Sequence, residues 1–144
     1  MRQLFDTSVL IPALVEAHPF HDRAFRLLGA AHRREFDWFV SQHTIAELYC
    51  GLTRLPYHEK MTPRLAQDAI RRNVLAYASV VALSAGDYEA VMGRMAELGL
   101  SGPLIYDALI ARAAEKAGVD KLFTFNPAHF KMVWPEGADI ITEP

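Results

Sequence analysis

Residues 2–10, RQLFDTSVL, join a short apolar strand directly to the start of a helix. Polar and apolar residues alternate loosely along this strand, which ends in an acid, Asp6. Ser8 follows, and serine can cap a helix at its N-terminus. Apolar residues then recur at helical spacing through residue 17. The chain therefore opens with a strand–helix unit whose junction carries a carboxylate.

The same alternation of strand and helix continues along the chain. Short β-rich segments predict further strands at 38–41, 79–83 and 122–125, and a fifth at an edge at 140–141. Helical patterns cover 44–52, 64–77, 84–98 and 104–117. Because strands separated by helices pair in parallel through crossovers, we predict an α/β fold: a three-layer α/β/α domain with a central, mainly parallel sheet of four to five short strands. No linker divides the chain, so we expect residues 1–144 to form a single domain.

Local signals mark several helix ends. Ser84 and Asp87 have the spacing of a capping pair before the helix at 84–98, and Gly99 supplies its stop. Gly118 ends the helix at 104–117 in the same way.

Helical spacing also predicts which side chains are buried. In the helix at 64–77, Leu65, Ala69, Val74 and Leu75 are expected to face inward. Cys50 lies on an apolar-rich helix and is interpreted as a small core residue rather than a nucleophile.

The composition bounds the class of protein. The chain has 144 residues, of which 51% are hydrophobic, and this rules out a disordered chain. Its single cysteine excludes an intramolecular disulfide and a cysteine-based zinc site. No apolar run reaches membrane-spanning length, and the first residues do not resemble a signal peptide. We therefore expect a cytoplasmic protein without a membrane partner.

Charge is unevenly distributed, although the formal net charge is only −2. Residues 1–72 hold ten Lys/Arg and eight Asp/Glu, whereas residues 73–144 hold five and nine. Arginine, which binds phosphate in a bidentate fork, makes up 11 of the 15 cationic residues. Solvated helix faces explain these arginines most simply on composition alone.

Several catalytic motifs are absent from the sequence. There is no GxxxxGK[ST] or GxGxxG phosphate loop, no HExxH zinc helix and no GxSxG nucleophile elbow. His18 and His21 lack acids at zinc-like spacing, so we interpret them as surface residues after a helix break.

Three acids are poorly explained by structural roles. Asp6 ends an apolar strand, where an unpaired carboxylate is costly to bury. Glu47 lies in an apolar helix, although a capping box with Thr44 is an equal alternative. Asp107 lies within LIYDALIA at 104–111, which is apolar on all sides and therefore predicted to be buried. Its position just after Pro103 also suits an acid that interacts with the helix dipole.

Acids that meet at strand ends repel one another unless a cation neutralises them. Mg²⁺ and Mn²⁺ prefer such oxygen ligands. These ions can activate water and stabilise charge at a phosphodiester, so an acid-lined pocket in an arginine-rich protein has the chemistry of a nuclease.

Four segments resemble the motifs of PIN-domain ribonucleases, in order and over nearly the whole chain. They are LFDTSVL at 4–10, SQHTIAEL at 41–48, DALIA at 107–111 and LFTFNPAHF at 122–130. The size of the chain is similar to that of the VapC-type toxins of toxin–antitoxin pairs.

The resemblance implies an endoribonuclease that depends on Mg²⁺ or Mn²⁺. It implies that Asp6, Glu47 and Asp107 are catalytic metal-site residues and that Ser8 and Thr124 are supporting hydroxyls. It also implies a homodimer inhibited by a small antitoxin protein. Setting the three acids aside changes the net charge from −2 to +1, so the net charge does not argue against an RNA substrate.

One position departs from the family pattern. The fourth motif often carries an acid where this chain has Asn126, a supporting residue without charge, and this weakens a second metal site more than the first.

Two alternatives stay open: a housekeeping PIN ribonuclease for RNA maturation, and an inactive PIN module that binds RNA or protein. A phosphatase with a strand-end Asp nucleophile is disfavoured because Ser8 stands where its second acid belongs.

Overall fold

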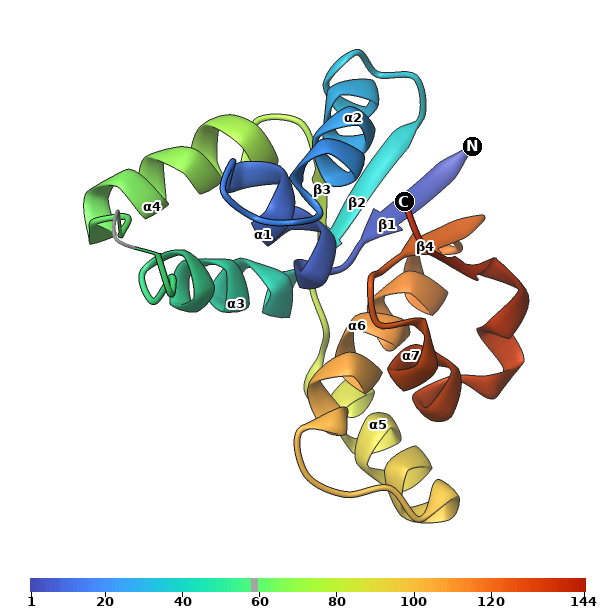
Figure 1. Cartoon of the computed structure of the whole chain (residues 1–144). Helices are drawn as coiled ribbons and strands as arrows, with labels where there is room; N and C mark the ends of the chain where they lie inside the picture. The colour runs from blue at the N-terminus through green and yellow to red at the C-terminus, as the bar shows by residue number, and fades with distance from the viewer. Residues whose placement is uncertain (58–59) are drawn as a thin grey trace.

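The computed structural model describes residues 1–57 and 60–144, and its centre is a parallel sheet (Figure 1). The sheet has five strands in the order β3-β2-β1-β4-β5, and every neighbouring pair is parallel. The strands are β1 (Arg2–Phe5), β2 (Asp37–Ser41), β3 (Ser79–Val81), β4 (Lys121–Phe123) and β5 (Ile141–Thr142). The predicted parallel sheet is confirmed, with the fifth strand at an edge.

Helices cover both faces of this sheet, as predicted (Figure 1). One face carries α1 (Thr7–Leu14), α2 (His21–His32), α3 (Gln42–Leu52) and α4 (Pro63–Ile70), and the other carries α5 (Ala85–Leu98), α6 (Leu104–Ala117) and α7 (Pro127–Val133). Successive residues of β1 point to opposite faces, so Phe5 joins the first hydrophobic core and Leu4 the second. In the described part of the chain, no helix is long and apolar enough to span a membrane.

The segment predicted as one helix at 64–77 is in fact two. α4 ends at Ile70 and a π-helical turn (Arg71–Leu75) follows it. The buried positions are Ala66, Ile70 and Val74, four residues apart. Val74 is therefore inward as predicted, but Leu65 and Leu75 lie on the exposed face and their predicted burial is wrong.

Cys50 is also exposed, contrary to the prediction of a core residue. The buried stripe of α3 consists of Thr44, Leu48 and Leu52, again at a spacing of four. Cys50 is two residues from each of the last two, so it lies on the opposite side of the helix.

The predicted helix ends around α5 and α6 are confirmed. Ser84 and Asp87 form a complete capping box, and Gly99 and Gly118 end their helices with φ of 67° and 60°, a left-handed conformation that glycine adopts without strain. The Asp87 carboxylate accepts hydrogen bonds from Lys116 Nζ at 2.9 Å and from Arg112 Nε at 3.1 Å, which ties α5 to α6. The Lys116 ammonium above all holds the pKa of Asp87 well below its usual range.

Parallel pairing places the ends of all strands at one edge of the sheet. The residues that follow β1, β2 and β4 therefore meet at this carboxyl edge, where ligand sites of α/β sheets form. Helix α2 returns the chain from β1 to the start of β2, so its N-terminus also lies at this edge.

Candidate active site

Asp6 is the buried polar group at the centre of the carboxyl edge. Its Oδ1 accepts a hydrogen bond from the Thr7 backbone N–H at 2.7 Å, which makes it the N-cap of α1. Its Oδ2 accepts from Ser8 Oγ at 2.7 Å and from Thr124 Oγ1 at 2.9 Å. Burial raises the pKa of this carboxyl, and the hydrogen bonds oppose the rise. The prediction that Ser8 caps the helix is wrong, because its hydroxyl serves the Asp6 carboxylate instead.

The two hydroxyls that hold Asp6 also fix the chain after β4. Ser8 Oγ accepts from the Phe125 backbone N–H at 2.9 Å, and Thr124 Oγ1 accepts from the Asn126 backbone N–H at 2.9 Å. Thr124 is fully buried, whereas Asn126 is exposed at the start of α7 and takes part through its backbone. The hydroxyls of Ser8 and Thr124 therefore both contact the Asp6 carboxylate, whereas Asn126 contacts Thr124 and not Asp6.

Helix α3 brings Glu47 to the same edge. Its N-cap is Ser41, whose Oγ accepts from the His43 backbone N–H at 3.1 Å, so the capping box considered between Thr44 and Glu47 does not form. Glu47 Oε1 instead accepts from Thr7 Oγ1 at 2.8 Å. This hydrogen bond joins Glu47 to Thr7, the residue directly after Asp6.

Helix α6 supplies Asp107 in its first turn after Pro103. Burial raises the pKa of Asp107 to about 6, and the negative charges of Asp6 and Glu47 add to the rise. His129, whose Nδ1 lies 3.7 Å from Asp107 Oδ2, opposes it. Asp6 and Glu47 therefore both lie close enough to Asp107 for their charges to disfavour its ionised form.

The start of α6 is less buried than the sequence predicts. The side chain of Asp107 is 22% exposed and Tyr106 is about half exposed. Full burial begins at Ala108 and continues through Ala111. The apolar run therefore buries its second turn, while its first turn faces a space open to solvent.

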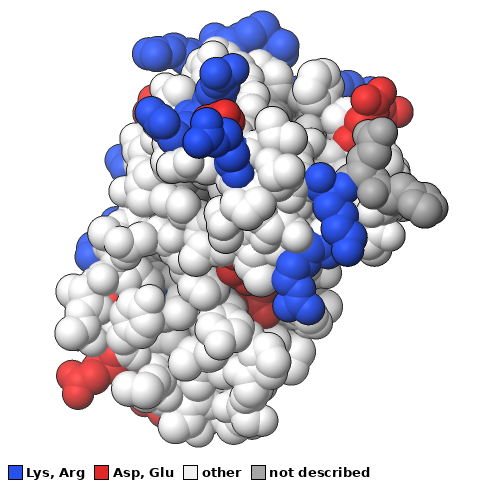
Figure 2. All heavy atoms as spheres, turned by 90° about the vertical axis from the view of Figure 1, so that its left-hand side faces the viewer, with Lys and Arg blue, Asp and Glu red and all other residues white. Residues whose placement is uncertain are grey.

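The donor set of this space fits a hard divalent cation. The carboxylates of Asp6, Glu47 and Asp107 offer oxygen ligands, and a cation would relieve the repulsion that Asp6 and Glu47 exert on Asp107. Among the residues that the structure describes, no three acids, histidines or cysteines converge closely enough to hold an ion already. Binding would therefore draw in Glu47 and Asp107, which are both partly exposed. On the face seen in Figure 2, acidic atoms are recessed in a hollow and Lys and Arg side chains lie beside it.

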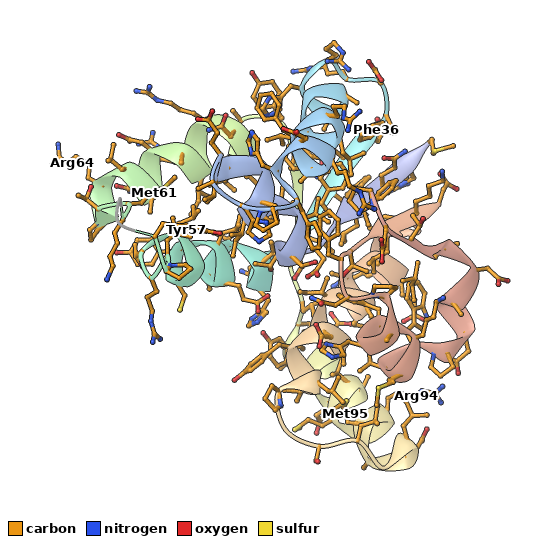
Figure 3. All side chains as sticks on the ribbon, in the orientation of Figure 1. Phe36, Tyr57, Met61, Arg64, Arg94 and Met95 are labelled. Carbon is orange, nitrogen blue, oxygen red and sulfur yellow. The ribbon has the colours of Figure 1, made fainter. Side chains whose placement is uncertain are left out.

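Two hollows lie elsewhere in the part of the chain that the structure describes. One of about 390 Å³ is lined by Arg94 and Met95 of α5 and by parts of α6 and α7. The other, of about 490 Å³, is lined by Tyr57 and Met61 and by residues 14–17 at the end of α1 (Figure 3). Neither is lined by the three carboxylates.

Comparisons with known proteins identify the family of this chain. Residues 4–133 match the profile of the PIN domain. The chain belongs to the PIN domain family. It is 37% identical over 109 residues to Ribonuclease VapC27 of Mycobacterium tuberculosis, a match that covers 76% of this chain and 74% of that protein.

Solved structures show the same PIN fold at low sequence identity. The VapBC2 structure from Rickettsia felis, bound to a promoter DNA fragment, aligns with a TM-score of 0.65 at 20% identity, covering 100% of this chain and 99% of that one. VapC20 of Mycobacterium tuberculosis, described as a toxin that cleaves the sarcin–ricin loop, aligns with a TM-score of 0.68 at 20% identity, covering 85% and 88%.

Sequence reasoning missed three side chains of this PIN domain site. Thr7 orients Glu47, and His129 lies beside Asp107. His43 stacks on Tyr106 with ring centroids 5.0 Å apart. This contact joins α3, which carries Glu47, to α6, which carries Asp107. His129 lies three residues after Asn126, and His43 lies four residues before Glu47. Residues at these spacings share one face of a helix, so this spacing could have predicted both histidines as neighbours of the site.

The raised pKa of Asp107 predicts a pH-dependent stability of the metal-free PIN domain. Because the folded-state value of about 6 exceeds the ordinary 3.8, stability is lost as pH rises through this window. Asp107→Asn removes the charge, so it should be more stable than the wild type above pH 6, by about 1 kcal/mol after discounting for solvent exposure. Urea unfolding in EDTA at pH 8 and at pH 4 measures the difference, which should vanish at the lower pH. A difference independent of pH contradicts the assignment.

Proposed function

We propose that this PIN domain is an endoribonuclease that hydrolyses RNA phosphodiester bonds with Mg²⁺ or Mn²⁺. The arrangement at the carboxyl edge carries the proposal: Asp6 accepts hydrogen bonds from Ser8 and Thr124, Glu47 accepts one from Thr7, and the charges of Asp6 and Glu47 act on Asp107. A relative with 37% identity bears the name ribonuclease, and structural neighbours include an RNA-loop-cleaving toxin. These facts favour hydrolysis over an inactive binding module.

Each site residue has a role that follows from its contacts. Asp6 and Asp107 would hold the cation directly, and Glu47 directly or through water. When bound, the cation supplies an activated water and neutralises charge on the scissile phosphate. Ser8 and Thr124 fix the orientation of the Asp6 carboxylate through hydrogen bonds of 2.7 and 2.9 Å.

Glu47 is the best-placed residue to position the attacking water. Its Oε1 is oriented by Thr7, and its side chain is about one-third exposed. Since water rather than the ribose 2′-hydroxyl attacks, the products carry 5′-phosphate and 3′-hydroxyl ends. Asn126 contributes no charge, so a single cation suits this site better than two.

We also propose that the chain is the toxin of a toxin–antitoxin pair, acting in the cytoplasm as a homodimer. Alignment along its whole length with a chain of a VapBC2 structure supports an antitoxin partner. This role is favoured over a housekeeping ribonuclease by the likeness to VapC27.

The proposed activity predicts a strict response to metal removal. Purified protein should cleave RNA with Mg²⁺ or Mn²⁺, stop when EDTA is added and resume when excess cation is restored. Electrophoresis of end-labelled transfer, ribosomal and messenger RNAs measures cleavage and the chemistry of the ends. Undiminished cleavage in EDTA would exclude the metal role, and cyclic phosphate ends would exclude attack by water.

A further inference from the structure

A second group of side chains at the carboxyl edge is not used by the carboxylate site. The segment HPFHDRAFR, residues 18–26, leads into the first turns of α2 and alternates aromatic rings with arginines. Aromatic rings interleaved with cations are typical of surfaces that bind single-stranded nucleic acid. Because α2 begins at the carboxyl edge of the sheet, this segment lies on the same side of the molecule as Asp6.

The rings of this segment form two stacks at the surface. Phe20 stacks on Phe125 with centroids 4.5 Å apart and planes 20° apart, and 42% of Phe20 remains exposed. His21 stacks on Phe25 at 5.1 Å, and Phe25 is about half exposed. Because these rings are nearly parallel and partly exposed, a flat ring of a ligand can stack on them.

Arginines lie on the first stack and next to the second in the sequence. The Arg23 guanidinium lies 5.1 Å from the Phe125 ring centroid and is itself held by Glu143, 3.1 Å away. Arg26, one turn along α2, is exposed and forms no ion pair with any residue described by the structure. Its Nε donates to the Asp22 carbonyl at 3.2 Å, so its guanidinium keeps donors for a phosphate next to an aromatic segment.

Phe125 connects these stacks rigidly to the carboxylate site. Its backbone N–H donates to Ser8 Oγ at 2.9 Å, and the same hydroxyl donates to Asp6 Oδ2 at 2.7 Å. The preceding residue, Thr124, donates to the same carboxylate oxygen. A base that stacks on Phe125 is therefore held at a fixed position relative to the Asp6 carboxylate.

We propose that Phe20, Phe125 and the neighbouring Phe25 form a stacking platform for unpaired RNA bases that flank the cleaved phosphodiester, with Arg26 on the backbone. The proposal rests on the proposed function, since it assigns part of the same substrate. Proteins read single-stranded RNA by stacking splayed bases on aromatic side chains. A purely apolar protein interface would not require the arginines between the rings.

The test uses a single-stranded oligoadenylate that carries one fluorescent adenine analogue, because stacking tolerates any base. Binding is measured in the Asp107→Asn background. Phe20→Leu should bind about tenfold more weakly and quench the analogue less, while Phe20→Tyr should behave as the parent. Tyr88→Leu is the matched control, because Tyr88 is 44% exposed on α5, away from α2 (Figure 1).

The outcomes separate this platform from the proposed function. Cleavage of natural RNA by the wild-type chain tests the function independently of oligoadenylate binding. Unchanged affinity and quenching in Phe20→Leu, or an equal loss in Tyr88→Leu, overturns the platform. A changed solution mass of Phe20→Leu with unchanged affinity also overturns it and assigns the rings to a contact with a second copy. Absence of binding by the parent overturns the platform, and absence of cleavage overturns the function.

Discussion

Asp107→Asn should lower RNA cleavage by more than about a hundredfold, since groups that merely support metal ligands are worth about 10- to 100-fold. Asparagine keeps the shape of the side chain but removes its charge, which burial first and the charges of Asp6 and Glu47 second disfavour, so the pKa of Asp107 is raised. Initial cleavage rates in Mg²⁺ and Mn²⁺ measure the effect, and circular dichroism checks the fold. Asp139→Asn, the same change at an exposed acid, should cleave as the wild type. Normal cleavage by Asp107→Asn would remove this residue from the site.

Phe5→Ala should destabilise the protein by about 3–5 kcal/mol, a large part of the roughly 5–15 kcal/mol that stabilises a domain. Phe5 is fully buried, and its ring lies 5.1 Å from Trp38, 5.8 Å from Phe123 and 6.0 Å from Phe36. Its removal leaves a cavity between β1, β2 and β4. Urea unfolding at neutral pH measures the loss.

The matched control for this cavity is Phe25→Ala, because Phe25 is about half exposed. That variant should unfold within about 0.5 kcal/mol of the wild type. Equal destabilisation by the two variants would show that burial does not account for the effect at Phe5. Cleavage by Phe5→Ala should also fall on warming, because Phe5 supports the strand end that carries Asp6.

Strand identity and order of elements could be predicted from the sequence because both depend on local patterns. Short apolar segments between helices leave little choice but parallel pairing. Helix ends marked by Ser84 and Gly118 were equally predictable, since a cap and a left-handed glycine act within one turn. The inward face of α4 was not, because leucine and alanine occupy both faces and only tertiary packing buries Ala66 rather than Leu65.

The candidate site was predictable as a set of residues but not as a set of contacts. Asp6, Glu47 and Asp107 stand out as acids in apolar segments. Which partner each acid takes is decided by neighbours distant in the chain: Thr7 rather than Thr44 engages Glu47 as its donor. The acceptor role of Asp6 toward Thr124 spans 118 residues, a separation that no local spacing rule addresses.

The strand order also governs when the site comes into existence during synthesis. β1 lies between β2 and β4, so one of its two edges stays unpaired until the residues of β4 have been synthesised. The hydroxyl of Thr124 and the backbone of Phe125, which secure Asp6 and Ser8, arrive with β4. An incomplete nascent chain therefore carries all three carboxylates without the support that orients the first of them. The Asp6 carboxylate therefore gains its full set of hydrogen-bond donors only when β4 pairs with β1.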